Sequence, residues 1–267
     1  TFQDPIDVST AFLPHWLDIG DINNDGHLDV VSANRSDGGT ISSVLGNGDG
    51  TFGEPRFFEA DENAGFLLLT DLSGDGLLDA VVASEFHHRS MVFVGKGDGS
   101  FQEPIPFSKS STTTSIQAAD LNGDGHRDLA WATFHDNQIS VLLGNGDGTL
   151  NSAARLLTGE TPNGLDLGDI DGDGRLDAVA VQFTGQGDDQ LLFLRGKGDG
   201  TLALDNRFSV GDGPEAVLLG DLDGDGLLDA ASASRFDSDM SVLLGNGDGT
   251  FQEHNRFDVG GQPNEGA

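Results

Sequence analysis

The chain has 267 residues, 40 of them Gly, with neither Cys nor Tyr and a formal net charge of −32 at pH 7. Its 13 Lys and Arg residues are too few to neutralise a phosphate backbone, so nucleic acid is not an expected partner. No apolar run approaches the roughly 20 residues of a membrane-spanning helix, and the absence of Cys excludes disulfides. No basic and apolar leader opens the sequence, so we expect any secretion signal to lie outside this chain.

Two markers recur in step along the chain at a period of about 50 residues, which is typical of propeller blades and other arrayed units. The first is an Asp-rich nonapeptide, DINNDGHLD at 21–29, which begins again at Asp71, Asp120, Asp169 and Asp221. The second is a Gly-x-Gly-Asp-Gly motif, GNGDG at 46–50, which begins again at Gly95, Gly144, Gly196 and Gly245. Much of the negative charge lies in these two motifs, which indicates bound cations more than a diffuse acidic surface.

The segments between the markers predict four short strands in each repeat. In the first repeat, WLDIG at 16–20 and DVVSA at 29–33 flank the acidic nonapeptide, ISSVLG at 41–46 precedes the glycine motif, and TFGEPRFF at 51–58 follows it. No stretch has a helical period. The sequence therefore predicts an all-β fold, a β-propeller of five four-stranded blades that forms a single domain over residues 1–267.

The ends of the chain leave one question open. TFQDPIDV at 1–8 and TFQEHNRFDV at 250–259 are both copies of the fourth strand, which gives six copies of that strand. Either copy completes a closed ring of five blades, or the chain is part of a longer array; the sequence supports both alternatives.

Variation in length is confined to one connection of the repeat. From the Phe or Leu two positions after the glycine motif to the next nonapeptide the interval is 19 residues every time, starting from Phe52, Phe101, Leu150 and Leu202 and from Phe2 at the equivalent position. From the last Asp of the nonapeptide to the glycine motif the intervals are 17, 16, 16, 19 and 16 residues. Because antiparallel strands alternate in direction, the variable connection between strands two and three lies at the end opposite the acidic loops.

The nonapeptide has the oxygen donors that Ca²⁺ prefers, spaced at alternate positions. It is not an EF-hand, because loop position twelve, where an EF-hand has a bidentate Glu, is occupied by Ser32, Val82, Trp131, Ala180 or Ser232. We expect the ninth-position Asp to replace that Glu, and we expect a loop without a cation to be strained or mobile because its carboxylates repel one another. The alternative is that the loops are simple Asx-turn hairpins.

We predict up to five calcium ions with a structural role, one in each nonapeptide. The seventh residue of each nonapeptide is expected to bind through its backbone carbonyl. They are Asp21, Asn23, Asp25, His27 and Asp29; Asp71, Ser73, Asp75, Leu77 and Asp79; Asp120, Asn122, Asp124, His126 and Asp128; Asp169, Asp171, Asp173, Arg175 and Asp177; and Asp221, Asp223, Asp225, Leu227 and Asp229. For the glycine motif we predict a turn, with a supplementary cation contact by its Asp as the alternative.

The pattern D-x-[DNS]-x-D-G-x-x-D, followed downstream by LGNGDGTF, resembles the FG-GAP/VCBS repeat, the unit of the integrin α-subunit propeller. The resemblance covers essentially the whole chain. It implies a propeller whose nonapeptides bind calcium between the first two strands of each blade. It says little about the ligand, because the family includes adhesion receptors, lectins and propeller domains attached to enzymes.

The variable connections are the predicted recognition site, because both length and residue type differ there while the frame stays constant. The expected ligand-binding residues are Arg35, His87, His88, Arg89, His135, Asp136, Arg235 and Asp237. A Phe recurs in the same connections, at Phe86, Phe134, Phe183 and Phe236, and we expect it to pack between neighbouring blades.

No nucleophile elbow, zinc-binding helix motif or phosphate-binding loop occurs in the sequence. We therefore expect a binding module without enzymatic activity, secreted or at the cell surface, that recognises an extracellular glycan or protein. The alternative is a lyase-like enzyme or enzyme domain that acts on polysaccharide in a central channel.

Overall fold

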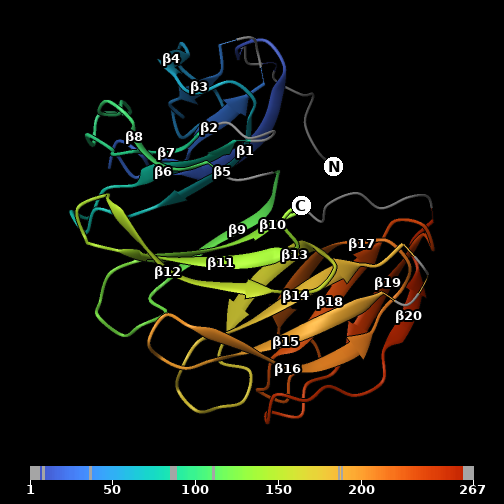
Figure 1. Ribbon diagram of the computed structural model, residues 1–267. Coiled ribbons are helices and arrows are strands. Elements are labelled where there is room, and N and C mark those ends of the chain that lie inside the picture. The colour runs from blue at the N-terminus through green and yellow to red at the C-terminus, as the bar shows by residue number, and fades with distance from the viewer. Residues whose placement is uncertain are drawn as a thin grey trace. The chain divides into compact units, whose positions relative to one another are not determined.

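The computed structural model describes residues 7, 10–35, 38–84, 89–109, 112–185, 187 and 189–260. The chain divides into two compact units, Thr1–Thr113 with Gly144–Leu150, and Thr114–Leu143 with Asn151–Ala267. All regular structure in the described residues is β, in five antiparallel four-stranded sheets whose strands are neighbours in chain order (Figure 1). The expected all-β fold with four strands per repeat is confirmed.

The strand bounds follow the repeat. They are β1 Pro14–Gly20, β2 Asp29–Asn34, β3 Thr40–Val44 and β4 Arg56–Glu59; β5 Ala64–Thr70, β6 Asp79–Ser84, β7 Arg89–Phe93 and β8 Ile105–Lys109; β9 Thr113–Ala119, β10 Asp128–Thr133, β11 Gln138–Gly144 and β12 Leu150–Leu157; β13 Thr161–Gly168, β14 Asp177–Phe183, β15 Gln190–Gly196 and β16 Leu202–Ser209; and β17 Pro214–Gly220, β18 Asp229–Ser234, β19 Asp239–Leu243 and β20 Asn255–Asp258.

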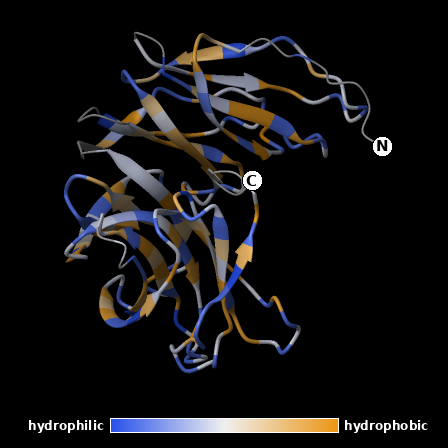
Figure 2. Ribbon diagram, turned by 90° about the vertical axis from the view of Figure 1, so that its right-hand side faces the viewer, coloured by the Kyte–Doolittle hydropathy of each residue, from blue (hydrophilic) through white to orange (hydrophobic). Residues whose placement is uncertain are grey.

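Apolar residues are concentrated on the strands (Figure 2), and within each unit the cores lie between consecutive sheets. In the first unit, Val31 and Ile41 of the first sheet pack with Leu67 and Phe93 of the second. Because second strands such as β6 are covered on both faces, they are buried along their whole length and read as continuous apolar runs.

The second unit repeats this packing between its own sheets. One core contains Ile139 of β11 and Leu192 of β15, and another contains Phe193 of β15 and Leu243 of β19. The recurring aromatic after the glycine motif belongs to these cores. Phe251, for example, meets the ring of Phe208 edge to face with centroids 5.3 Å apart.

Neighbouring first strands are joined by side chains. The Oδ2 atom of Asp18 in β1 accepts a hydrogen bond of 2.8 Å from the backbone N–H of Leu69 in β5. Asp166 in β13 accepts one of the same length from Leu219 in β17. These bonds tie each sheet to the next within a unit.

The C-terminal copy of the fourth strand completes the fifth sheet, because β20 pairs with β19 in the register Asp239↔Asp258. Residues 1–6 of the N-terminal copy lie outside the described residues. No helix in the described part of the chain is long and apolar enough to cross a membrane.

Candidate functional site

Each Asp-rich nonapeptide connects the first and second strands of one sheet. We call these nonapeptides acidic loops 1 to 5; they are residues 21–29, 71–79, 120–128, 169–177 and 221–229. We call the glycine motifs turns 1 to 5; they are residues 46–50, 95–99, 144–148, 196–200 and 245–249. The ninth-position Asp of every loop is also the first residue of the second strand and is fully buried. Loops and turns lie at the same end of each sheet, as the alternation of strand direction requires.

The ninth-position Asp joins its loop to the turn of the same repeat. In loop 1, Asp29 accepts hydrogen bonds from the backbone N–H of Ile22 at 3.0 Å and of Gly46 in turn 1 at 2.8 Å. The equivalent Asp79, Asp177 and Asp229 make the same pair of bonds. Desolvation by burial raises the pKa of Asp29, Asp79 and Asp177. Each hydrogen bond from these N–H groups lowers the pKa, but by less than burial raises it.

These bonds give the ninth Asp a structural role that the sequence did not reveal. Each carboxylate oxygen has two lone pairs, so each oxygen of Asp29 keeps one for a cation, whereas Oδ2 of Asp79 accepts from both Leu72 and Ser73. The predicted role in calcium binding therefore stays a prediction, and the carboxylate is a structural acceptor in addition.

The rest of the loop is also closed by bonds from backbone N–H to carboxylate. The first-position Asp21 accepts from the N–H of Gly26 at 2.9 Å, and the fifth-position Asp25 accepts from His27 at 2.8 Å. The His27 N–H holds the pKa of Asp25 below its usual value. Gly26 has φ of +87°, a left-handed conformation that favours glycine. The Asx-turn alternative thus describes the hydrogen bonding of these loops correctly.

In loops 1 and 3 the seventh-position side chains, His27 and His126, are exposed to solvent. The ring of His27 covers Gly48 of turn 1, where an added Cβ would be 2.4 Å from the ring. Leu227 covers Gly247 of turn 5 in the same way, at 2.8 Å. The middle glycine of the turn is therefore required both by its positive φ and by the side chain above it.

The third position divides the loops into three classes. In loops 1 and 3 it is Asn23 or Asn122, whose Nδ2 donates to the fifth-position Asp at 2.9 or 2.8 Å. In loop 2 it is Ser73, and in loops 4 and 5 it is a fourth Asp.

Loops 4 and 5 bring three carboxylates together. Asp169, Asp171 and Asp177 in loop 4, and Asp221, Asp223 and Asp225 in loop 5, each have oxygens that all lie within 4.8 Å of one another. The Oδ1 atom of Asp169 is buried and has no hydrogen-bond partner among the described residues. Such a set of oxygen donors fits a hard divalent cation such as Ca²⁺.

The turns use their Asp internally. Asp49 Oδ1 accepts from the N–H and hydroxyl of Thr51, at 2.9 and 2.6 Å, and this hydroxyl holds the pKa of Asp49 below its usual value. Asp98, Asp147, Asp199 and Asp248 make the same contacts with the residue two positions on. The predicted turn role is confirmed.

At the opposite end of the sheets, the expected ligand-binding residues are largely paired within the chain. Arg89 contacts Asp61 at 3.0 Å, Arg235 contacts Glu215 at 3.1 Å, and Asp237 contacts Arg256 at 2.5 Å. Of these, only Arg235 and Asp237 share a turn.

The remaining expected residues that the structure describes make contacts within their own units. The His135 ring meets Phe134 edge to face, with centroids 5.0 Å apart. The backbone N–H of Arg35 donates to the Leu13 carbonyl, and Asp136 occupies the β10–β11 turn. His87 and His88 lie outside the described residues, as does Phe86.

The recurring Phe packs as predicted where the structure describes a pair. Phe183 and Phe236 have centroids 5.7 Å apart and join the fourth and fifth sheets. Two hollows of about 250 and 180 Å³ lie elsewhere, on Phe58 and Phe101 and on Phe208 and Phe251, and contain none of the expected ligand residues.

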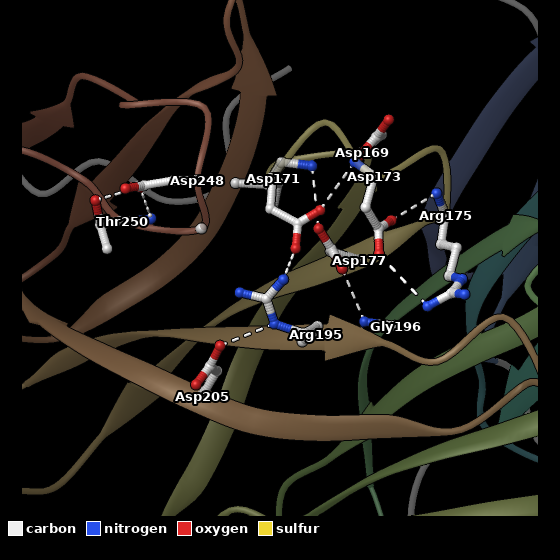
Figure 3. Close-up of polar contacts among 12 residues, drawn as sticks. Asp169, Asp171, Asp173, Arg175, Asp177, Arg195, Gly196, Asp205, Asp248 and Thr250 are labelled. Atoms are coloured by element: carbon white, nitrogen blue, oxygen red, sulfur yellow. Dashed lines mark hydrogen bonds and ion pairs between the residues drawn. The ribbon is translucent and has the colours of Figure 1, made fainter.

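Sequence reasoning missed Arg195, the last residue before turn 4. Its guanidinium contacts Asp171 of loop 4 and donates to Asp205 of β16 at 2.9 Å (Figure 3). It also lies over the ring of Phe193, 5.4 Å from the centroid. One feature of the sequence could have indicated Arg195: at the position before the turn, the other four repeats have an apolar residue, which is Leu45, Val94, Leu143 or Leu244.

Several solved structures are similar to this chain. A lectin from Agrocybe aegerita, described as recognising non-reducing terminal N-acetylglucosamine, has a TM-score of 0.65 at 20% identity, with 91% of this chain and 65% of the lectin covered. A periplasmic gluconolactonase from Pseudomonas aeruginosa has a TM-score of 0.65 at 16% identity, covering 94% and 72%. A functionally unknown protein from Desulfotomaculum acetoxidans has a TM-score of 0.65 at 14% identity, covering 96% and 72%.

At these identities the likeness concerns the fold alone, and the chain spans about two thirds of the length of the lectin. No match was found among curated proteins. The model of the FG-GAP-like repeat matches residues 21–82, 71–131, 120–180 and 169–232, each match running from one acidic loop into the next repeat. The chain therefore belongs to the family of FG-GAP-like repeat proteins.

Proposed function

We propose that this chain is a calcium-stabilised binding module that recognises an extracellular glycan or protein at the end of the sheets opposite its acidic loops. The observation that supports the metal most directly is the group of three carboxylates in loop 4, with a buried Asp169 oxygen that lacks a hydrogen-bond donor. A divalent cation supplies the charge that such a group needs.

Calcium has a scaffold role in this proposal. The loops shape one end of each sheet, and the variable connections at the other end present Arg89, Arg235 and their neighbours. Arg89 and Arg235 are half-exposed, and exposed ion pairs contribute little to stability, so both guanidiniums stay available to a ligand. A carboxylate or a row of hydroxyl groups is the chemistry that they would bind.

We further propose that the five sheets are the blades of one β-propeller and that the protein acts outside the cell, where millimolar calcium suits loops of this class. The stacking of consecutive sheets within each unit and the tandem family matches support the propeller.

The test is a glycan and protein binding screen in calcium, followed by the double change Arg89→Ala and Arg235→Ala. We expect binding to fall about tenfold or more, as for the loss of charge-assisted contacts. The matched control is Arg155→Ala, which removes an exposed charge from β12. Binding that is insensitive to the double change but lost on altering residues of the turns would place the site at the other end. Turnover of a polysaccharide by the chain would favour the enzyme alternative.

A further inference from the structure

Loop 4 differs from every other acidic loop in the cations that surround it. Loops 4 and 5 have Asp at positions one, three, five and nine. Loop 4 also has Arg175 at position seven and Arg195 before turn 4, whereas loop 5 has Leu227 and Leu244 at these positions. The two loops therefore form a matched pair with the same carboxylates and different neighbouring charges.

Arg195 contacts loop 4 but belongs to a different hairpin. It is the penultimate residue of β15, the third strand of the fourth sheet, and its guanidinium contacts Asp171, whose side chain is only 4% exposed. The guanidinium also contacts Asp205 (Figure 3). It lies over the ring of Phe193 as well. Gly249 of turn 5 leaves room for it, since a Cβ there would be 3.1 Å from Nη2.

This contact neutralises one member of the carboxylate group. Asp171 shares its group with Asp169 and Asp177, so a metal bound there would use the carboxylate that Arg195 already pairs. The charge-assisted contact with Asp171 must weaken before Asp171 is fully available, while the bond to Asp205 can persist. In loop 5 no guanidinium contacts Asp221, Asp223 or Asp225 among the described residues.

We propose that Arg195 is the resident counter-ion of loop 4, which keeps this loop ordered without metal and makes it a weaker divalent-cation site than loop 5. The proposal rests on the metal binding proposed above. It predicts that the two loops fill in a fixed order as calcium rises, with loop 5 first, and that loop 5 loses order first when calcium falls.

The experiment is hydrogen exchange followed by mass spectrometry on the full chain across a calcium titration, read separately on peptides that cover 169–177 and 221–229. In the unmodified chain the loop 5 peptide should gain protection at lower calcium than the loop 4 peptide. Arg195→Leu, which installs the residue type of the other repeats, should lower the midpoint for loop 4 about fivefold to tenfold, the range expected for loss of a partly exposed ion pair. The midpoint for loop 5 should not move.

The reciprocal change is Leu244→Arg, which should raise the midpoint for loop 5. Arg155→Leu on β12 controls for the change in net charge. Combining Asp169→Asn with Arg195→Leu should abolish the decrease in the calcium midpoint of loop 4, because this decrease depends on the loop 4 carboxylates.

A second readout separates a counter-ion from a packing residue. In EDTA, Arg195→Leu should lower the melting temperature and increase hydrogen exchange in loop 4. In saturating calcium the variant and the unmodified chain should differ less in both measurements. Equal destabilisation in both conditions would show that Arg195 only packs on Phe193 and Asp205 and would overturn the proposal. If calcium binds but Arg195→Leu leaves the loop 4 midpoint unchanged, the proposal fails while the metal function stands. If calcium protects neither loop in any variant, both fail.

Discussion

Acidic loops 4 and 5 carry the same four carboxylates in the same register, yet one has two arginines beside it and the other has two leucines. In loop 4 the first-position Asp169 keeps an oxygen without a donor, whereas Asp221 of loop 5 accepts from Gly224 at 2.7 Å and from Gly226 at 3.0 Å. The comparison teaches that residues outside a ligand motif decide the electrostatics of the site. A repeat motif read alone would assign both loops the same affinity.

Chelation of calcium is the change with the largest expected effect. With dissociation constants of about 10⁻⁴–10⁻³ M, millimolar calcium stabilises the folded chain by roughly 0.4–1.4 kcal/mol per site, or about 2–7 kcal/mol for five sites. Excess EDTA should therefore lower the melting temperature by several degrees or more in differential scanning calorimetry. An unchanged melting curve, with no calcium found by elemental analysis, would remove the metal from both loops and leave plain turns.

Removal of the ninth-position carboxylate should come next and should affect the two loops alike. Asp177→Ala leaves the buried N–H groups of Ile170 and Gly196 without an acceptor, and Asp229→Ala does the same for Leu222 and Gly245. Each unsatisfied N–H costs about 1–3 kcal/mol, so we expect a loss of about 2–6 kcal/mol for either variant in urea unfolding with EDTA.

The corresponding Asn variants are the controls for this pair, since Asn keeps one acceptor oxygen and should cost less. A much smaller loss at Asp177 than at Asp229 would mean that the arginines beside loop 4 compensate for the bonds, and the two loops would then differ in structure as well as in charge.

The turns beside the two loops should respond equally to acid. The hydroxyls of Thr201 and Thr250 hold the pKa of Asp199 and Asp248 below the unfolded value of about 3.9. A lowered folded pKa contributes stability that is present above about pH 3.9 and is lost as the pH falls through the folded pKa. Asp199→Asn and Asp248→Asn should therefore be less stable than the parent at neutral pH, and this difference should narrow in acid.

Melting temperatures measured in EDTA between neutral pH and pH 3 check this prediction. A difference that is independent of pH would show that the Thr hydroxyl bonds are indifferent to the charge of the carboxylate.

The smallest effect should come from Arg175. It contacts Asp173 at 3.5 Å, and the two side chains are 57% and 33% exposed. Exposed ion pairs contribute about 0–1 kcal/mol, so Arg175→Leu, which copies Leu227, should change stability by about 0.5 kcal/mol or less. The calcium midpoint of loop 4 should move less than about twofold by calorimetric titration. If Arg175→Leu moved the calcium midpoint of loop 4 as much as Arg195→Leu, the difference between the two loops could not be attributed to Arg195 alone.

Much of the fold was predictable because the informative contacts are local. A first and second strand are joined by only eight residues, so alternation and the Asp-Gly pattern were sufficient to predict the hairpin, which has the register Gly20↔Asp29. The fixed interval before each loop and the variable interval after it also placed the two kinds of connection at opposite ends.

The missed features join segments that are distant in sequence. The bond from Leu69 to Asp18, the His27 ring over Gly48 and the Arg195 contact with Asp171 each link different hairpins. A period-2 pattern indicates which face of a strand is covered but does not identify the side chain that covers it. For that reason the contacts of His27 with Gly48 and of Arg195 with Asp171 could not be predicted from the pattern.

The buried Asp that begins each second strand has a consequence for engineering. Since one carboxylate fastens the start of a hairpin to the turn that follows two strands later, the chain length between these points at the acidic end is fixed by a pair of bonds. At the opposite end the natural repeat already accepts three extra residues, with an interval of 19 in the fourth repeat where three others have 16. The buried Asp189 there accepts bonds from Thr184 and Gly213. Foreign peptides grafted between Thr184 and Asp189, with both residues retained, should be displayed without disturbing the frame, so the repeat is suited to serve as a scaffold for designed recognition.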